Sequence, residues 1–330
     1  MVDSTRYQVA VIIPTLNEER FIAGCLDSVV RQTYPFGRMD VMVIDGGSKD
    51  RTRAIVEEFG RQYDNIRLLD NPGRIQSVAF NIGCRGSDAP YVIRLDAHVS
   101  YDIRYVELCI SYLMRCPELG NVGGICKIIP PVSHIIAESN AILNQVPFGI
   151  GGAAFRVGKK AAYVDTVPFG AFPRTVIEQI GGMREDLIRG EDNEYNSRIR
   201  KAGYKILFDP QIECTYYARD TVTGSVRQMY ANGKSIGRLV YIDRTSIGLR
   251  HLVPLCFVLC LLLSFVFGFI WLPIWWFAGG ILLVYFIAAT IATLSICRKF
   301  GFKYVLVLPW LFFVVHFSYG CGTIVGLAKH

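Results

Sequence analysis

The sequence predicts an α/β domain with a mainly parallel mixed sheet, followed by a C-terminal α-helical transmembrane region. Two observations predict this organisation. In the first hundred residues, short apolar and β-branched runs alternate with segments of helical periodicity, the pattern of right-handed βαβ crossovers. Residues 251–330 contain no Asp or Glu and only four basic residues, although 52% of the 330-residue chain is hydrophobic. The apolar excess is therefore concentrated in a segment suited to lipid.

The alternation of strands and helices is regular up to residue 95. Strands are expected at residues 9–14, 40–45, 66–69 and 91–95, and helices at residues 21–30, 52–59 and 75–84. The strands are continuously apolar, as is typical of strands that a parallel sheet buries on both faces. Beyond residue 121 the alternation weakens. Residues 122–125 and 148–153 are rich in glycine, which favours bulged strands or close approach of a substrate to the backbone.

We expect three regions along the chain. Residues 1–224 form a cytosolic domain, residues 225–250 a basic amphipathic helix region at the membrane surface, and residues 251–330 a membrane domain. About three transmembrane helices are expected, at residues 252–270, 275–296 and 304–325. The last of these could instead be re-entrant or interfacial, because Pro309 and several glycines interrupt it. Arg298, Lys299 and Lys303 place the first domain in the cytosol by the positive-inside rule.

Composition and missing motifs exclude several classes of function. The net charge of +7 comes without a concentrated Lys/Arg tract, which argues against nucleic acid as a partner. The ten cysteines include no Cys-x-x-Cys pair, as expected for free thiols in a reducing compartment. The first eight residues are polar, so no signal peptide is expected. The chain lacks the glycine motifs of dinucleotide enzymes and of P-loop NTPases.

Polar side chains follow three of the expected parallel strands. Ligands of such sheets bind at the carboxyl ends of the strands, where this sequence places Thr15, Glu18, Asp45, Asp96 and His98. In an extended segment, residues 96 and 98 project to the same side, so a carboxylate and an imidazole could share one cation. This pair suits Mn²⁺ or Mg²⁺ bound together with phosphate oxygens. We therefore expect the turn to hold the diphosphate of a sugar nucleotide. The alternative is that Asp96 caps the turn and His98 lies on the surface.

Other side chains are expected to complete the donor site. Asp45 is a plausible acceptor for a base N–H group, and Arg74 a plausible phosphate partner, with a solvated helix start as its alternative. Asp165 could contact an acceptor sugar. Arg227 and Lys234, in the basic helix, could reach a diphosphate or a lipid headgroup.

A second group of polar residues opens a helix that runs through Ile199. Glu191, Asp192 and Glu194 stand in its first turn, where carboxylates also complement the helix dipole. A carboxylate at this distance after the metal turn could form the other wall of a cleft and act as a general base. We assign that role to Asp192. Glu191 and Glu194 are expected to raise its pKa or to position it.

Four motifs together resemble the family 2 glycosyltransferases, which are inverting enzymes with the GT-A fold. They are Val-Ile-Ile-Pro-Thr-Leu-Asn-Glu-Glu at residues 11–19, Val-Ile-Asp-Gly-Gly-Ser-Lys-Asp at 43–50, Asp-Ala-His at 96–98 and Glu-Asp at 191–192. The resemblance covers residues 7–240. Residues 164–172, 191–196 and 216–220 are most similar to succinoglycan-type exopolysaccharide glucosyltransferases. The resemblance implies that Asp96 and His98 meet the metal and the diphosphate and that Asp192 is the base. The residues that it places on the uridine nucleotide are Pro14, Thr15, Glu18, Asp45 and Arg74.

The expected function is transfer of a sugar from a UDP-sugar, with UDP-glucose as the leading donor, to a lipid-linked saccharide acceptor. The enzyme would be an integral protein of a bacterial or archaeal plasma membrane, in contact with membrane lipid, and would form a β-glycosidic bond. His98 stands where many relatives have Asp, which leaves the choice of metal open. The Gln-x-x-Arg-Trp motif of processive synthases is absent, which favours one sugar per encounter. Two alternatives are a sugar hydrolase with paired carboxylates and a nucleotide-sensing membrane or transport protein.

Overall fold

The computed structural model describes residues 7–329, and Ile150 by its backbone only. Residues 1–6, part of the polar N-terminal stretch considered above, lie outside the described residues. The chain forms two compact units. The catalytic unit, as we call the first, comprises Met1–Lys127 and Ala154–Tyr216, and the helical unit comprises Ile128–Ala153 and Tyr217–His330. No sequence pattern predicted that residues 128–153 would group with the C-terminal helices.

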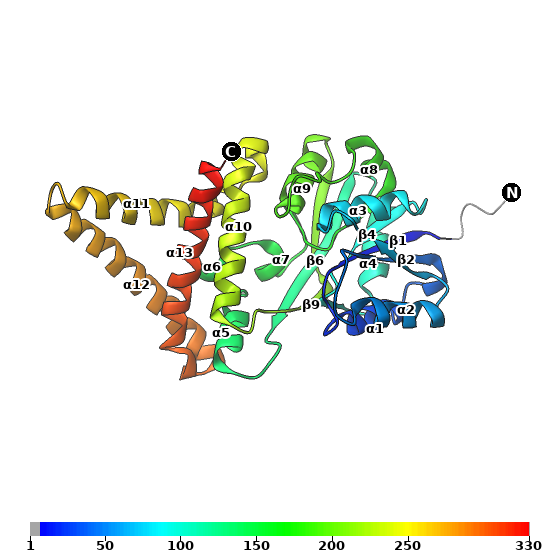
Figure 1. The fold of residues 1–330 in the computed structure, drawn as a ribbon, viewed down its shortest axis with the longest axis horizontal. Coiled ribbons are helices and arrows are strands. Elements are labelled where there is room, and N and C mark those ends of the chain that lie inside the picture. Colours follow the sequence, from blue (N-terminus) through cyan, green and yellow to red (C-terminus); the bar gives the residue numbers. More distant parts are fainter. Residues whose placement is uncertain (1–6, 330) are drawn as a thin grey trace. The chain divides into compact units, whose positions relative to one another are not determined.

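A nine-stranded mixed sheet forms the centre of the catalytic unit (Figure 1). Strand β1 (Val9–Thr15) lies between β2 (Met39–Asp45) and β4 (Tyr91–Arg94), and β3 (Ile66–Asp70) follows β2. All three of these pairings are parallel. Antiparallel strands then extend the sheet beyond β4, in the order β8-β6-β9-β5, with β7 paired to β9. The predicted mainly parallel mixed sheet is confirmed.

The remaining strands and helices of the catalytic unit connect and cover this sheet. The strands are β5 (Val99–Tyr101), β6 (Leu119–Ile129), β7 (Ala162–Tyr163), β8 (Ala171–Pro173) and β9 (Lys205–Tyr217), of which β6 and β9 continue into the helical unit. The helices are α1 (Ile22–Val30), α2 (Thr52–Gln62), α3 (Gln76–Arg85), α4 (Tyr105–Arg115), α7 (Ala154–Val157), α8 (Arg174–Ile180) and α9 (Glu191–Lys201).

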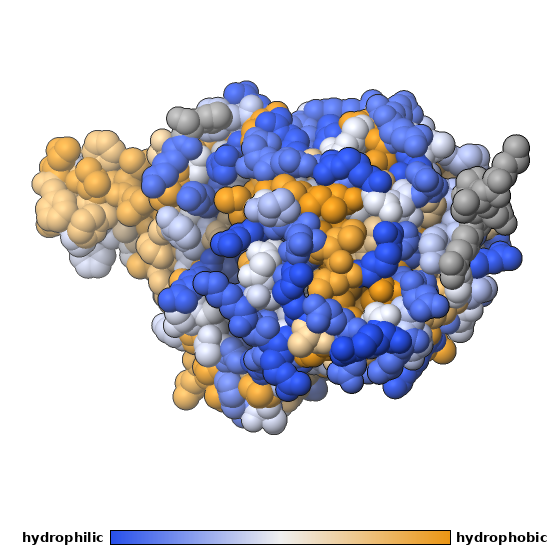
Figure 2. Space-filling view, turned by 45° about the vertical axis from the view of Figure 1, so that its right-hand side comes forward, coloured by the Kyte–Doolittle hydropathy of each residue, from blue (hydrophilic) through white to orange (hydrophobic). Residues whose placement is uncertain are grey.

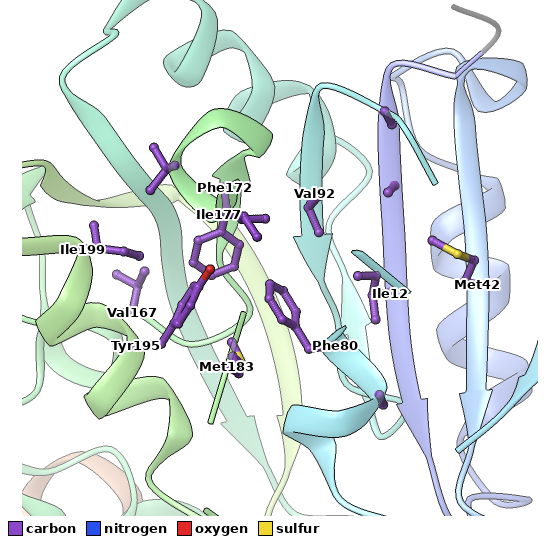
Figure 3. Close-up of a cluster of buried hydrophobic side chains, with 14 of the residues drawn as sticks. Ile12, Met42, Phe80, Val92, Val167, Phe172, Ile177, Met183, Tyr195 and Ile199 are labelled. Atoms are coloured by element: carbon purple, nitrogen blue, oxygen red, sulfur yellow. The ribbon is translucent and has the colours of Figure 1, made fainter. Parts of the chain in front are cut away.

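Aromatic packing fixes α9 against the sheet (Figure 3). Tyr195 of α9, Phe80 of α3 and Phe172 of β8 pack edge to face, with ring centroids 5.6 to 5.7 Å apart. All three are buried in one hydrophobic cluster with strand residues that include Ile12. Helix α3 lies close to β1 because Gly83 faces Ile12, where an added Cβ would come within 2.5 Å of that side chain. This packing fixes the position of the first turn of α9 relative to the sheet.

The helical unit contains α5 (Ile135–Leu143), α6 (Pro147–Ile150), α10 (Val222–Ile242), α11 (Val253–Gly268), α12 (Pro273–Phe300) and α13 (Val307–Ala328). Within the described residues, the segments Leu249–Gly268, Pro273–Phe300 and Val307–Ala328 are long and apolar enough to cross a membrane. Helices α11 and α12 form a hairpin (Figure 1), and Figure 2 shows that its surface is almost uniformly apolar. The expectation of bulged strands at residues 148–153 is wrong, because Pro147 opens a short helix there.

Candidate active site

The carboxyl ends of the parallel strands are joined by backbone hydrogen bonds. The amide of Gly46 donates to the carbonyl of Thr15 at 2.8 Å, and the amide of Asn71 donates to the carbonyl of Asp45 at 2.7 Å. Pro14 and Thr15, the last residues of β1, are buried, and the Thr15 hydroxyl donates to the Ile13 carbonyl at 3.3 Å. These bonds bring the turns that follow β1, β2 and β3 to one edge of the sheet.

Asp45 shapes the turn after β2. Its side chain is fully buried and accepts hydrogen bonds from the Gly47 and Ser48 amides and from Arg53, each at 3.0 Å, and from the Ser48 hydroxyl. Burial opposes its charge, but the bonds from Ser48, Arg53 and Gly47 outweigh burial and lower the pKa of Asp45. Because a carboxylate has about four acceptor positions, protein donors already satisfy Asp45. Its expected contact with a base stays a prediction.

Two residues at this edge adopt left-handed backbone conformations. Asn17, after β1, has φ +56°, and Arg74, after β3, has φ +59°. Arg74 is exposed, and a Cβ added to Gly47 would lie 3.8 Å from its guanidinium. Non-glycine residues with positive φ cost conformational free energy and cluster at functional sites. Arg74 therefore stands beside the turn after β2, where the sequence predicted a phosphate partner.

Asp96 and His98 lie in a turn and not on an extended strand. Strand β4 ends at Arg94, and the amide of Val99 donates to the Asp96 carbonyl at 3.2 Å. The alternation of faces that grouped residues 96 and 98 therefore does not apply. The Asp96 amide donates to the hydroxyl of Tyr101 at 2.7 Å, and the Asp96 side chain is 11% exposed. The turn is thus held by its own backbone and by one buried tyrosine.

Glu18 joins the turn after β1 to this turn. Its carboxylate lies 2.9 Å from Nδ1 of His98. The Glu18 amide donates to the hydroxyl of Thr52 at 2.8 Å, which fixes the backbone at that position. The His98 ring also packs edge to face against Tyr216, with centroids 5.3 Å apart. The imidazole is therefore oriented from two sides.

Arg94 connects the turn after β4 with α9. Its side chain is 3% exposed and stands opposite Ile12 in the sheet. Nη2 donates to Asp96 at 3.0 Å, and Nη1 donates to Asp192 and lies 3.6 Å from Glu191. One buried guanidinium thus holds three carboxylates. The sequence analysis missed Arg94, although a lone arginine in an apolar strand signals buried partners.

The first turn of α9 places Asp192 at this guanidinium. The helix begins after Gly190, whose φ of +80° is left-handed, and Tyr195 anchors it in the core. The Asp192 side chain is 35% exposed, whereas that of Glu191 is 6% exposed. Glu194 pairs with Arg198 at 2.7 Å one turn later. Glu194 is therefore bound elsewhere, and the expectation that it positions Asp192 is wrong.

Glu191 and Asp192 are harder to ionise than free carboxyl groups. Burial raises the pKa of Asp192, Arg94 lowers it, and the neighbouring Asp96 raises it further. Burial, followed by the charge of Asp192, raises the pKa of Glu191, against the effect of Arg94. The sequence predicted that Glu191 would raise the pKa of Asp192, but the carboxylate that does so is Asp96.

The donor set fits a divalent cation that takes further ligands from a substrate. Among residues 7–329, no group of three or more His, Cys, Asp or Glu side chains could hold a metal ion by itself. Asp96 and His98 offer one carboxylate and one imidazole. Glu18 holds Nδ1 of His98 in the way that a carboxylate commonly orients a metal-bound histidine. Diphosphate oxygens would have to complete the coordination.

The remaining predicted contact residues belong to other segments of the chain. Asp165 is exposed in the segment after β7. Arg227 and Lys234 lie on α10, in the helical unit. Their predicted contacts with a diphosphate or an acceptor stay predictions.

Comparisons with known proteins agree with the fold and with the motifs. Residues 10–181 match the family described as Glycosyl transferase family 2. A dolichyl N-acetyl-alpha-D-glucosaminyl phosphate 3-beta-D-2,3-diacetamido-2,3-dideoxy-beta-D-glucuronosyltransferase of Methanococcus voltae is 28% identical, over 97% of either chain. The succinoglycan biosynthesis protein ExoA of Rhizobium meliloti (strain 1021) is 27% identical, over 74% of either chain.

Two solved structures share the fold. The mannosyltransferase PcManGT from Pyrobaculum calidifontis, in complex with GDP-Man and Mn²⁺, has a TM-score of 0.62 at 20% identity, over 99% of this chain and 89% of that chain. Residues 1–349 of S. aureus TarS, in complex with UDP, have a TM-score of 0.51 at 13% identity, over 96% and 90%. The predicted GT-A fold and the resemblance to succinoglycan-type enzymes are confirmed. The match over residues 10–181 covers more than half of the chain, which therefore belongs to glycosyl transferase family 2.

Proposed function

We propose that this glycosyltransferase is an inverting, non-processive enzyme that moves one sugar from a UDP-sugar to a lipid-linked saccharide. One observation carries the proposal. Asp96, in the turn expected to face the diphosphate, and Asp192, the expected base, are bound by the same guanidinium of Arg94. The shared guanidinium would hold the expected diphosphate turn and the expected base next to one bound sugar donor.

Asp192 would act as the general base. It takes the proton of an acceptor hydroxyl while that oxygen attacks the anomeric carbon and the bond to the diphosphate breaks. The raised pKa of Asp192 makes it a stronger base than an ordinary aspartate. Because Asp192 is 35% exposed while Arg94 is buried, the carboxylate can be approached from solvent. Arg94 opposes protonation and so favours the ionised form that a base needs.

Asp96, His98 and Arg74 would bind the diphosphate, the first two through a metal ion. A divalent cation held by Asp96 and His98 would supply positive charge to the leaving group. Glu18 would fix the His98 ring, and Arg74 would approach from the neighbouring turn. The complexes of the two structural relatives, one with GDP-Man and Mn²⁺ and the other with UDP, support a nucleoside diphosphate donor and a metal.

A lipid-linked acceptor is supported by the chain's own helices. The helical unit provides apolar helices that would keep the enzyme at a membrane, where a lipid-linked saccharide is also confined. The Methanococcus voltae relative, matched over nearly its whole length, is named for a dolichyl phosphate substrate.

Asp192→Asn tests the base. The variant keeps the side-chain volume and is expected to bind the nucleotide while transfer falls by about 10²- to 10⁴-fold, the usual contribution of a general base. Full-length protein in lipid would be assayed for nucleotide release with UDP-glucose, lipid extract and Mn²⁺. Glu178→Gln, on the exposed side of α8, is a matched control that should keep the parent rate. Transfer by Asp192→Asn at the parent rate would remove Asp192 from this role.

The product distinguishes transfer from hydrolysis. Inverting transfer from an α-linked UDP-sugar gives a β-glycoside and consumes donor only when acceptor is present. NMR of the anomeric proton identifies the configuration. An α-linked product, or free sugar released without acceptor, would favour a retaining or hydrolytic reaction.

A further inference from the structure

Helices α10 and α13 pack side by side in parallel, with their backbones in direct contact (Figure 1). A Cβ added to Gly322 of α13 would lie 2.1 Å from the carbonyl oxygen of Tyr230, and one added to Gly326 would lie 2.2 Å from that of Lys234. Gly233 of α10 approaches α13 in the same way. Such small-residue contacts fix the distance and the direction of two helices. The two helices must therefore have the same inclination to any membrane.

Contacts at the far end of the pair continue the same register. The hydroxyl of Tyr241, near the end of α10, donates to the carbonyl of Leu327, near the end of α13, at 3.0 Å. Near the start of the pair, Met229 packs in one buried cluster with Leu308 and Val315. The helices therefore lie together over most of their lengths, and one cannot cross a bilayer while the other stays on its surface.

Helix α10 is too polar to cross. It is absent from the three apolar segments found within the described residues, and it carries Arg227, Lys234 and Arg238 at intervals along its length. A basic residue at the centre of a bilayer costs about 2.5–3.5 kcal/mol on insertion scales. Basic residues also follow the helix, at Arg244 and Arg250. A helix of this composition lies at the membrane surface.

Helix α13 differs from α11 and α12 in its surroundings. Of its apolar window, 39% is buried within the protein, against 22% for each of the other two. Its His316 donates from Nε2 to the carbonyl of Gly149, and its Nδ1 is hydrogen-bonded with the Tyr285 hydroxyl, each at 2.7 Å. Its Tyr319 hydroxyl lies 2.9 Å from His251. Protein therefore covers more of α13 than of α11 or α12.

We infer that α13 lies in the plane of the membrane surface beside α10, that only α11 and α12 cross the bilayer, and that the C-terminal end of α13 stays on the side of the catalytic unit. The surface formed by α10 and α13 would rest on the lipid headgroups. Charge agrees with this placement. Basic residues stand at the two ends of the α11–α12 hairpin, at Arg250 and at Arg298 and Lys299, whereas its uncharged turn carries Trp271 and Trp275.

The inference changes the number of crossings expected from the sequence. Length and composition alone predicted about three, with the third open to an interfacial placement. An even number returns the chain to its starting side, so residue 329 would face the same compartment as residue 217. This placement holds whichever sugar the catalytic unit transfers.

Depth measurements test the orientation of α13 in the full-length protein. Positions 310, 317 and 324 lie seven residues apart on nearly one face of the helix, about 10 Å apart along its axis. With residues 271, 275 and 276 changed to phenylalanine, single tryptophans would be compared at 310 (native), in Phe317→Trp with Trp310→Phe, and in Ile324→Trp with Trp310→Phe. Quenching by lipids brominated at different depths should give one depth for all three. A position 317 deeper than 310 and 324 would overturn the inference.

A protease-protection experiment tests the sidedness independently. Cleavable tags would be placed after residue 329, after residue 271 in the hairpin turn, and after Lys160 in an exposed segment of the catalytic unit. In sealed vesicles with the catalytic unit outward, the tags at 160 and 329 should be cleaved, and the tag at 271 should be cleaved only after detergent. A protected tag at 329 would mean that α13 crosses. Cleavage at 271 without detergent would overturn the crossing by α11 and α12.

Discussion

The guanidinium of Arg94 donates to the carboxylate of Asp192, from a residue 98 positions earlier in the chain. The bond joins the end of β4 to the first turn of α9, the two elements that carry the expected diphosphate turn and the expected base. A buried charge without a partner is costly, so the carboxylates and the guanidinium stabilise one another's ionised forms. Arg94 therefore both holds the Asp192 side chain in place and limits the rise of its pKa.

Replacing Arg94 with lysine should move the pH dependence of transfer. Lysine keeps the positive charge but cannot bridge Asp96 and Asp192 with a planar fork. Because Arg94 lowers the pKa of Asp192, a weaker interaction lets that pKa rise. The base must be ionised to act, so the acidic limb of the kcat/KM profile should shift to higher pH. The profile would be measured by nucleotide release between pH 5 and 9.

Arg67→Lys provides the matched control for that experiment. Arg67 of β3 pairs with the buried Asp40 at 2.7 Å, at the other end of β2 from Asp45. Loss of the planar guanidinium of Arg67 should lower the stability of the folded protein without changing the pH profile of transfer. Equal shifts in both variants would show a general effect on the fold. An unchanged pH profile in Arg94→Lys would mean that Arg94 does not influence the pKa of the group that acts as the base.

The wild-type protein should lose stability as the pH rises, because Glu191 releases its proton. Glu191→Gln has no such proton to release and should not show this loss. Burial raises the pKa of Glu191 to about 7, so the folded protein keeps a proton that the unfolded chain releases near its ordinary value. This contribution to stability is present at acidic pH and is lost as the pH rises through the folded pKa. Relative to wild type, the variant's thermal midpoint should therefore increase between about pH 5 and pH 8. A difference that stays constant across this range, followed by circular dichroism, would contradict the assignment.

The parallel half of the sheet could be predicted because its signals are local. Buried β-branched runs and amphipathic helices follow one another up to residue 95, and the predicted strands agree with β1 to β4 to within one residue at each end. The later strands are antiparallel, and their partners lie far apart in the chain, as β5 and β9 do. Residues 128–153 pack with helices that are distant in the sequence, and the periodicity of the segment itself does not predict this packing.

The site could be predicted in its residue types and not in its pairings. Asp96 and Asp192 stand out because they are polar at a strand end and at a helix start. Their common partner, Arg94, occupies an inward position of an apolar strand, where side-chain periodicity predicts only burial. The contact of Glu18 with His98 spans 80 positions, and its geometry follows from the sheet order and not from either motif.

Glu18→Gln should lower the affinity of the enzyme for the metal, because Glu18 contacts His98. A carboxylate on Nδ1 orients a ligating imidazole and increases its basicity, and loss of such a partner commonly costs 10- to 100-fold in metal affinity. The Mn²⁺ concentration for half-maximal transfer should rise by about tenfold, with a smaller change in the rate at saturating Mn²⁺. Metal titration of nucleotide release would measure both quantities.

Glu19→Gln is the control for the metal titration. Glu19 is the exposed neighbour of Glu18, and its carboxylate accepts from the Arg51 amide at 3.0 Å. The control should leave the Mn²⁺ requirement unchanged. If Glu18→Gln also leaves it unchanged, the contact with His98 does not serve metal binding.

Alanine at two glycines of the apolar helices should have opposite effects on stability. At Gly322 an added Cβ would lie 2.1 Å from the Tyr230 carbonyl oxygen, so Gly322→Ala must separate α13 from α10, at a cost of about 1–3 kcal/mol. At Gly280 of α12 an added Cβ meets nothing within 4 Å, and alanine should stabilise that helix by about 0.5–1 kcal/mol. All four tryptophans lie in the helical unit, so their fluorescence reports its thermal midpoint. The midpoint should fall in Gly322→Ala and stay equal or rise in Gly280→Ala. A Gly322→Ala midpoint equal to wild type would mean that α10 and α13 do not touch through their backbones.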